Sequence, residues 1–277
     1  MVNTNRIISS TIIVVALIAI IMVVTNSSSS GGGGQFFTFS DIVYGQSSPN
    51  TTTKDNTSNN STTLPVLLIH GYMEDAAVWN KWVDLLKKDD ISVYPITFKQ
   101  SDDKCGSSAE HAKELSKIIG QIKEETGQNK VNIVGHSKGG LDARVYLANN
   151  TKDVANLVMI GTPNAGSPLA ESCEVGTPAV YDLRPGAAAT EVNMNPNTKY
   201  YTIAGDWNPQ SENYQLFFSF EQVGFSSLPI PNDGMVSVSS VESQDYFINL
   251  GHSTNCHSNL LSDYEYELAK DLILGKK

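Results

Sequence analysis

Residues 131–140 contain a short apolar run that leads directly into a serine flanked by glycines. The run Val-Asn-Ile-Val is followed by Gly-His-Ser-Lys-Gly-Gly, which places a Gly-x-Ser-x-Gly pattern around Ser137. The apolar run is typical of a buried parallel strand. After the serine, Leu141, Val145 and Ala148 recur at helical spacing. This order of strand, tight turn and helix predicts a serine exposed on a sharp turn at the edge of an α/β sheet.

The two glycines of the pattern have a steric role. Gly135 and Gly139 stand where a Cβ would collide with the neighbouring strand or helix, and Ser137 itself is expected in strained backbone geometry. A serine hydroxyl is a weak nucleophile at neutral pH. Chemistry at Ser137 therefore requires a base, an acid that orients the base, and hydrogen-bond donors for an oxyanion.

From Leu64 onward, short apolar runs alternate with amphipathic helical patterns. This alternation predicts an α/β domain with a mostly parallel central sheet and helices on both faces. The predicted strands are 64–70, 91–98, 131–134, 156–161, 200–204 and 246–250. Four helices are predicted. The first covers 76–88, with Val78, Trp82 and Leu85 on one side, and the second carries Ala112, Leu115 and Ile122 and ends at Gly127. The third follows Ser137, and the last covers 260–274. The long connection 163–197 predicts a short lid or binding wall.

The first 63 residues differ in composition from the rest of the chain. Arg6 precedes an apolar stretch from Ile7 to Val24, whose length lies between a signal-peptide core and a membrane-spanning helix. Ser, Thr, Asn and Gly dominate residues 25–63, which predicts a flexible linker. We therefore expect a membrane anchor or signal segment at 1–24, a linker at 25–63 and the α/β domain at 64–277. The charge before the apolar stretch predicts that this domain is extracellular, either anchored at the cell surface or secreted.

The charge balance and the cysteines exclude several kinds of partner. Lys plus Arg total 19 against 29 Asp plus Glu, a formal net charge of −10. This balance argues against nucleic acid as a partner and favours neutral substrates. Cys105, Cys173 and Cys256 permit at most one internal disulfide, whose pairing their spacing does not assign, and they match no metal site.

Two histidines near the end of the chain are candidates for the base. In a fold with this strand and helix order, the acid and then the base follow the serine along the chain. His252 comes directly after Gly251 at the end of the last predicted strand, and His257 precedes the terminal helix. We favour His257 and keep His252 as the alternative.

Two aspartates between the serine and these histidines are candidates for the acid. Asp233 lies in Pro-Asn-Asp-Gly-Met-Val, where Gly234 allows a tight turn and the apolar residues beyond it hold the loop in place. Asp-Gly is also an ordinary turn dipeptide. Asp206, at the end of the predicted strand 200–204, therefore remains the alternative acid.

Two backbone N–H groups are the expected oxyanion donors. One belongs to Lys138, directly after the serine, and the other to Tyr72, in the His-Gly-Tyr-Met loop that follows the first strand. Gly71 allows the backbone of this loop to approach the serine closely.

Together these motifs resemble the bacterial and archaeal lipase and esterase branch of the α/β-hydrolase superfamily. The matching segments are His-Gly-Tyr, Gly-His-Ser-Lys-Gly-Gly, Ile-Gly-Thr-Pro-Asn-Ala-Gly-Ser at 160–167, Asn-Asp-Gly-Met-Val and Cys-His-Ser-Asn-Leu-Leu, within roughly 64–274. The resemblance implies the α/β-hydrolase fold, with Asp233 as acid and His257 as base. It also implies cleavage of carboxylic esters, acylglycerols among them, through an acyl-enzyme on Ser137 and without an organic cofactor. The structural calcium of some related lipases has no matching ligand cluster in this sequence.

The same residue types serve other functions. A thioesterase, acyltransferase or peptidase uses the same three residues, and a non-catalytic binding module can use the same scaffold. We expect an ester or a lipid as substrate, and contact with a membrane through the N-terminal segment if that segment is retained.

Overall fold

The computed structural model describes residues 63–149, 151–172, 176–209 and 220–276. The predicted N-terminal segment and nearly all of the predicted linker, residues 1–62, lie outside these described residues. Among the helices of the described ranges, none combines the length and the apolar character that a membrane span needs.

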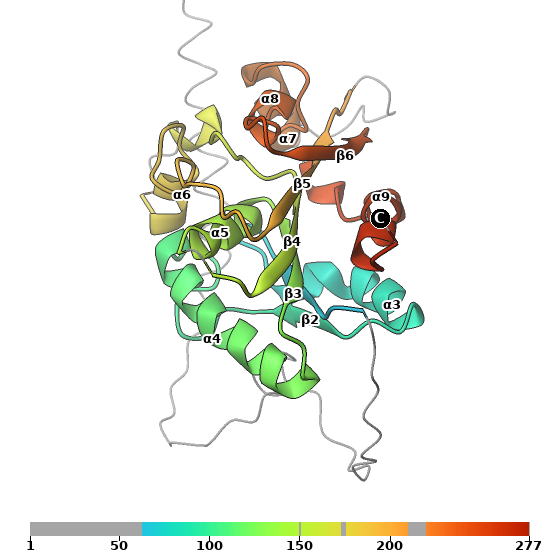
Figure 1. The fold of residues 1–277 in the computed structure, drawn as a ribbon. Coiled ribbons are helices and arrows are strands. Elements are labelled where there is room, and N and C mark those ends of the chain that lie inside the picture. Colours follow the sequence, from blue (N-terminus) through green and yellow to red (C-terminus); the bar gives the residue numbers. More distant parts are fainter. Residues whose placement is uncertain (1–62, 150, 173–175, 210–219, 277) are drawn as a thin grey trace, which may run out of the picture.

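A parallel sheet of six strands forms the centre of the described part of the molecule (Figure 1). Its strands are β1 Val66–Ile69, β2 Val93–Ile96, β3 Val131–His136, β4 Val154–Ile160, β5 Lys199–Gly205 and β6 Ile248–Ser253. Their order across the sheet is β2-β1-β3-β4-β5-β6, and every neighbouring pair is parallel. The predicted parallel sheet is confirmed, and the loops that follow the strands meet at one edge because all strands run the same way.

Helices cover both faces of this sheet (Figure 1). The helices α4 Ser108–Thr126 and α5 Lys138–Leu147 pack on one face, and α3 Asn80–Lys88 and α9 Asp263–Ile273 on the other. The shorter elements are η1 Ala76–Trp79, η2 Pro168–Ala170, α6 Pro178–Asp182, α7 Phe220–Ser227, α8 Val238–Val241 and η3 His257–Asn259.

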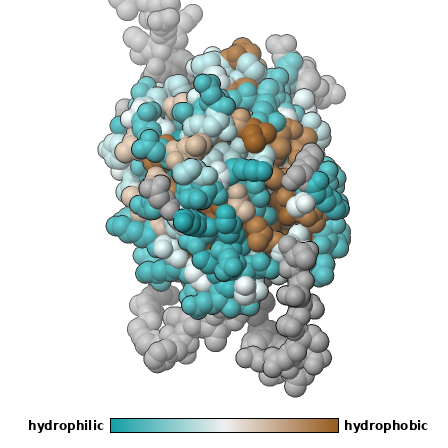
Figure 2. Space-filling view, viewed as in Figure 1, coloured by the Kyte–Doolittle hydropathy of each residue, from teal (hydrophilic) through white to brown (hydrophobic). Residues whose placement is uncertain are grey.

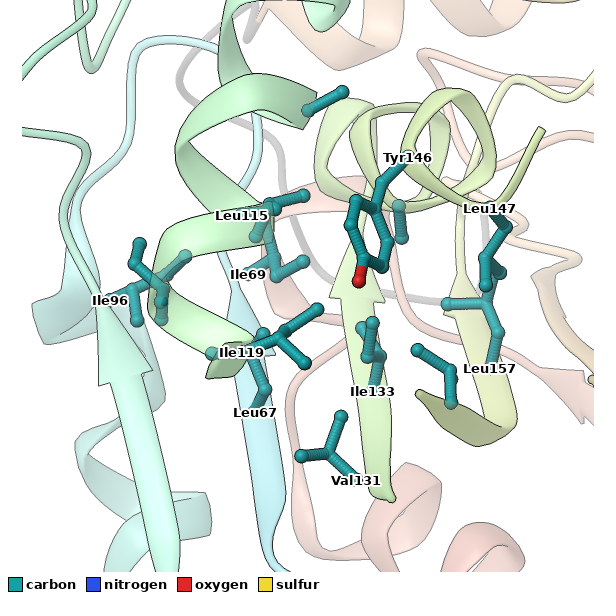
Figure 3. Close-up of a cluster of buried hydrophobic side chains, with 14 of the residues drawn as sticks. Leu67, Ile69, Ile96, Leu115, Ile119, Val131, Ile133, Tyr146, Leu147 and Leu157 are labelled. Carbon is teal, nitrogen blue, oxygen red and sulfur yellow. The ribbon is translucent and has the colours of Figure 1, made fainter. Parts of the chain in front are cut away.

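Alternate residues of β1 to β5 enter two different cores because the side chains of a strand have a period of two. Leu67 and Ile69 of β1 join the cluster under α4 and α5, where Figure 3 shows them beside Leu115 and Ile119. The residue between them, Leu68, belongs to the cluster under α3 and α9. Burying one such side chain contributes about 1.5–3 kcal/mol. Both faces of β1 are therefore apolar, as the continuous run 64–70 predicted.

The outer surface has a different composition from these cores. Figure 2 shows one face on which hydrophilic residues cover most of the area, while hydrophobic residues gather toward the side of α9 and β6. This distribution agrees with a chain that carries 29 acidic residues and a net charge of −10.

The predicted helix 76–88 is confirmed in its extent, with a 3₁₀ turn, η1, in place of its first turn. Val78, Trp82 and Leu85 all pack against the cluster under α3 and α9, as predicted. The residues buried most deeply are Trp79, Trp82, Val83 and Leu86, whereas Val78 and Leu85 are partly buried on the same face.

The helix that was predicted to end at Gly127 is confirmed. Ser107 and Glu110 form a capping box at the start of α4, which satisfies backbone N–H groups that have no partner within the helix. Gly127 ends the helix with a φ of 69°, a left-handed conformation that glycine adopts without a steric penalty.

The last predicted strand is displaced along the chain, and the last predicted helix is present but shorter than predicted. Strand β6 covers 248–253 instead of 246–250, so His252 lies inside the strand rather than after it. The terminal helix begins at Asp263, because Ser262 caps it and forms a capping box with Glu265. Strand β6 lies at the edge of the sheet and is half exposed, so its apolar pattern is weak.

The connection between β4 and β5 contains η2 and α6 and is anchored to α5 by a buried arginine. Arg144 donates to the carbonyl oxygen and the side-chain oxygen of Asn164 at 3.1 and 3.0 Å, and to Thr190 O at 3.2 Å. These bonds hold both ends of the connection against the helix that follows Ser137. Its role as a lid stays a prediction.

Candidate active site

Ser137 forms the turn between β3 and α5. Its backbone has φ 51° and ψ −125°, and a non-glycine residue held in such a sparsely populated region costs about 1–3 kcal/mol. The Ser137 N–H donates to Ile160 O at 2.8 Å, which ties the turn to β4. The predicted strain at this serine is therefore present and is supported by the adjacent strand.

The two flanking glycines have no room for a side chain, as predicted. A Cβ on Gly139 would lie 2.4 Å from Ile69 O, at the end of β1. A Cβ on Gly135 would lie 2.6 Å from Gly140 N, in the first turn of α5. The first turn of α5 thus packs directly against the end of the sheet, and only glycine permits this approach.

A chain of hydrogen bonds joins Ser137 to a histidine and an aspartate. His257 Nε2 lies 2.9 Å from Ser137 Oγ, and His257 Nδ1 lies 2.7 Å from Asp233 Oδ2. The other carboxylate oxygen of Asp233, which is fully buried, accepts the N–H groups of Met235 and Val236 at 2.9 and 2.7 Å. The His257 N–H also donates to Asp233 O at 2.9 Å. The carboxylate is therefore held on one side by its own turn and aimed at the imidazole on the other.

The environment of His257 favours the bound proton. Burial by itself lowers the pKa of His257, but the charge and hydrogen bond of Asp233, with smaller contributions from Glu74 and Glu221, raise it above its ordinary value. An imidazole with a carboxylate on one nitrogen and a hydroxyl on the other can accept the hydroxyl proton as a general base.

The two alternative residues lie apart from this chain of hydrogen bonds. Asp206 follows β5 with an exposed side chain, and its N–H donates to Ser253 O at 2.7 Å. The ring of His252 is 40% exposed, and its Nε2 lies 2.6 Å from Glu242 Oε1. The structure thus brings Asp233 and His257 together with Ser137 and leaves Asp206 and His252 outside.

The predicted oxyanion loop lies against the serine. A Cβ on Gly71 would be 2.9 Å from Ser137 Cβ, so the backbone at Gly71 passes close to the serine side chain. Lys138 is the first residue of α5, where backbone N–H groups have no intrahelical partner. The two predicted donors belong to the residues that directly follow Gly71 and Ser137.

The side chain of Lys138 enters a buried ionic cluster that the sequence analysis missed. Its Nζ lies 2.6 Å from Asp142 Oδ1, and His111 Nδ1 lies 2.8 Å from Asp142 Oδ2. Burial opposes the charge of Asp142, but Lys138 and His111 hold its pKa at about 2. The spacing of four residues between Lys138 and Asp142 on a helix is a signal that was present in the sequence.

Glu74 is a second residue that the sequence analysis missed. Its Oε2 accepts the Gly71 N–H at 2.7 Å and lies 2.8 Å from His136 Nδ1. A carboxylate three residues after the glycine of the loop is a weak signal, because the His136 partner is 62 positions away in the sequence.

Residues 65–220, more than half of the chain, match the model of the palmitoyl protein thioesterase family. The chain belongs to this family of α/β-hydrolases. The resemblance that the motifs indicated is thus confirmed at the level of the superfamily and its lipase and esterase branch.

Curated relatives of this α/β-hydrolase match a limited part of it. Triacylglycerol lipase of Pseudarthrobacter phenanthrenivorans is 35% identical over 118 residues, which are 40% of this chain and 36% of the lipase. Triacylglycerol lipase of Burkholderia plantarii is also 35% identical over 118 residues, covering 40% of this chain and 32% of the lipase. The chain matches about a third of the length of these relatives.

Solved structures support the fold of this α/β-hydrolase over a longer range. The mature form of a Bacillus licheniformis lipase superposes with a TM-score of 0.66 at 22% identity, covering 77% of this chain and 93% of the lipase. A metagenomic carboxyl esterase gives a TM-score of 0.60 at 16% identity, covering 97% of this chain and 89% of the esterase. The predicted α/β-hydrolase fold is confirmed.

The two described cysteines of this α/β-hydrolase stand outside the hydrogen-bonded chain of Ser137. Cys105 and Cys256 are free thiols, and Cys173 lies outside the described residues. Burial raises the pKa of Cys256 to about 11, so its thiol is protonated at neutral pH. Within the described ranges, no group of three or more His, Cys, Asp or Glu side chains is arranged to hold a metal ion.

Proposed function

We propose that this protein is a serine hydrolase that cleaves carboxylic esters through an acyl-enzyme on Ser137. The observation that carries the proposal is the hydrogen-bonded series Ser137, His257 and Asp233 at a strained turn of an α/β-hydrolase fold. The triacylglycerol lipase relatives support an ester carbonyl as the group that is attacked.

In the first half of the reaction, Ser137 Oγ attacks the carbonyl carbon of the ester while His257 Nε2 takes its proton. Asp233 keeps the imidazole in the required orientation and stabilises its positive charge. The N–H groups of Tyr72 and Lys138 hold the oxyanion of the tetrahedral intermediate. As the bond to the leaving oxygen breaks, His257 returns its proton to that oxygen, and the alcohol departs.

In the second half, water takes the place of the alcohol. His257 removes a proton from the water as its oxygen attacks the acyl carbon of the Ser137 ester. The second tetrahedral intermediate then expels Ser137 Oγ, which recovers a proton from His257. The products are the free carboxylic acid and the original enzyme.

Thioester cleavage is a second candidate function, because the matched family is the palmitoyl protein thioesterase family. The same residues attack a thioester carbonyl, and a thiolate leaves with less help from the protonated His257 than an alkoxide does. Oxygen esters and thioesters of the same acyl chain distinguish the two candidates through their kcat/KM values. The acyl chain length is then defined with a series of p-nitrophenyl esters.

Labelling with a fluorophosphonate probe tests whether Ser137 is the nucleophile. The wild-type protein and Ser258→Ala, which removes an exposed hydroxyl next to His257, should both be labelled and should both hydrolyse p-nitrophenyl esters. Ser137→Ala should lose both properties while keeping the same circular dichroism spectrum. Labelling that persists in Ser137→Ala contradicts the proposal, and it would also show that another hydroxyl reacts.

We also propose that the α/β domain acts outside the cell. Arg6 and the apolar stretch 7–24 support this placement, since they have the order of charge and hydrophobicity found in export signals and anchors. Fractionation of cells that express the whole chain tests it. Protein in the membrane fraction indicates a retained anchor, and released protein lacking the first residues indicates a cleaved signal. Full-length protein in the cytosol contradicts the placement.

A further inference from the structure

The Glu74 carboxylate connects three segments that surround Ser137. One of its oxygens accepts the Gly71 N–H at 2.7 Å and faces His136 Nδ1 at 2.8 Å. The opposite nitrogen of His136 lies 3.2 Å from the carbonyl oxygen of His257. The oxyanion loop, the end of β3 and the turn that carries the base are therefore joined through a single buried imidazole.

The carbonyl of Gly71 is held as well as its N–H. Gly71 O lies 2.9 Å from His70 Nδ1 and accepts the backbone N–H of Glu74 at 3.4 Å. This carbonyl belongs to the same planar peptide as the N–H of Tyr72, and the two groups point in opposite directions in a trans peptide. The direction of the Tyr72 N–H is therefore set on one side by the bonds to the Gly71 carbonyl, and on the other by the Gly71 Cα, whose own N–H the Glu74 carboxylate holds.

The Glu74 side chain is a charged acceptor for the Gly71 N–H. Burial raises the pKa of Glu74, but the charge and hydrogen bond of His136 together with the Gly71 N–H lower it to about 2. The carboxylate is consequently charged at neutral pH. Hydrogen bonds to a charged acceptor are roughly twice as strong as those between neutral groups.

We propose that Glu74 is a positioning residue that orients the Gly71 to Tyr72 peptide so that the Tyr72 N–H meets the oxyanion. This inference rests on the proposed function, because an oxyanion forms only if Ser137 attacks a carbonyl. Glu74 acts through Gly71 and His136 and does not touch the substrate.

Three variants separate this role from a general effect on the fold. Glu74→Ala removes the acceptor of the Gly71 N–H, and Glu74→Gln keeps an oxygen there without the charge. The matched control is Asp75→Asn, which alters the next carboxylate of the same loop. Asp75 caps η1 by accepting the Ala77 N–H at 3.0 Å, a role that asparagine also fills.

The transition state should lose more stabilisation than the bound substrate. For Glu74→Ala we expect kcat to fall by about 10- to 100-fold, because a misplacement of about 1 Å can cost 10²-fold, while KM stays near its wild-type value. Inhibition by an alkyl boronic acid, which forms a tetrahedral adduct with the serine, should weaken by the same factor. Glu74→Gln should lose about three- to tenfold in kcat, since the neutral acceptor is weaker. Asp75→Asn should match the wild type in all three measurements.

The pH profile supplies a readout that a structural defect would not move. The titratable groups around His257 are Asp233, Glu74, Glu221 and His136. The charge of Glu74 contributes to raising the pKa of His257, so the acid limb of kcat/KM should lie at lower pH in Glu74→Gln than in Asp75→Asn.

Several outcomes would overturn the inference. A folded Glu74→Ala protein with wild-type kcat would do so, as would a loss confined to KM with unchanged boronate inhibition. If Glu74→Ala does not fold, Glu74→Gln is the deciding variant. A kcat of Glu74→Gln equal to that of Asp75→Asn would then refute the positioning role of Glu74. A wild-type protein that neither reacts with the probe nor cleaves esters or thioesters refutes the proposed function instead.

Discussion

Two histidine and aspartate pairs of nearly the same geometry lie next to consecutive residues of the elbow. His257 Nδ1 is 2.7 Å from Asp233 Oδ2, and His111 Nδ1 is 2.8 Å from Asp142 Oδ2. All four residues are buried. The first pair adjoins Ser137 and the second adjoins the side chain of Lys138.

The two pairs differ at the opposite nitrogen of the imidazole. His257 Nε2 faces the hydroxyl of Ser137, which can donate a proton to it. His111 Nε2 faces the carbonyl oxygen of Asp102 at 2.9 Å, which can only accept. His111 therefore acts as a donor within an ionic cluster, whereas His257 can act as a base. The third partner, and not the aspartate, distinguishes a reactive histidine from a structural one.

The largest expected effect comes from removing His257, the base of the first pair. His257→Ala should lower kcat by about 10⁶-fold, the loss seen when a serine hydrolase is deprived of its general base. Steady-state hydrolysis of p-nitrophenyl esters measures it, with His252→Ala as the control that should keep wild-type turnover. Loss of turnover only in His252→Ala, with the fold intact, would show that the base was assigned to the wrong histidine.

The next effect concerns the acid of the same pair. Asp233→Asn should lower kcat by about 10⁴-fold, because an amide favours the wrong tautomer of His257. The exposed Asp206→Asn serves as the control and should retain its activity. Equal losses in both variants would argue that neither carboxylate orients the base.

A substitution in the second pair should lower the free energy of unfolding. Asp142→Ala leaves the buried Lys138 ammonium without a countercharge and His111 Nδ1 without its carboxylate partner, so the free energy of unfolding should fall by about 3–5 kcal/mol. Urea denaturation measures this change. Asp263→Ala is the control, because its ion pair with Lys81 is largely exposed and such pairs contribute about 1 kcal/mol or less. An Asp142→Ala protein as stable as the control would show that the cluster is not a source of stability.

The smallest expected effect is the response of the two pairs to acid. The pKa of His257 is raised, so kcat/KM should decline already as the pH falls through a value above its ordinary 6.5. The carboxyls of Asp142 and Glu74 have pKa values of about 2, below their ordinary 3.8 and 4.5. Their stabilisation is complete above about pH 4.5 and is lost as the pH falls toward 2, and Asp142 alone contributes about 2 kcal/mol.

Activity should therefore disappear at a higher pH than the fold does. Ester hydrolysis and circular dichroism recorded across the same pH range test this order. Simultaneous loss of both signals would contradict the assignment of the two pairs to different roles.

Features that depend on neighbouring residues were the most predictable. The elbow around Ser137 follows from a strand, two glycines and a helix within about twenty residues, and the end of α4 follows from Gly127 alone. The division of 76–88 into a 3₁₀ turn and α3 was not predicted. Strand β6 was misplaced because an edge strand that is half exposed has a weak apolar pattern.

The choice between two candidate side chains of the same type depended on the tertiary structure. Asp233 and Asp206 both follow the serine, and neither local sequence shows which carboxylate approaches His257. The contact of Glu74 with His136 spans 62 positions, and that of His111 with Asp142 spans 31. Only the parallel arrangement of strands brings such residues together.

By itself, the sequence determined the class of fold, the strained serine and the small set of acids and bases that accompany it. Apolar periodicity and glycine geometry act over a few residues, so they can be read locally. The tertiary structure alone decided which histidine faces Ser137, because that contact joins residues 120 positions apart. It also decided that the neighbouring Lys138 turns into a buried ionic cluster. The adjacent side chains of Ser137 and Lys138 thus have different partners, because the packing of distant segments places a different group beside each of them.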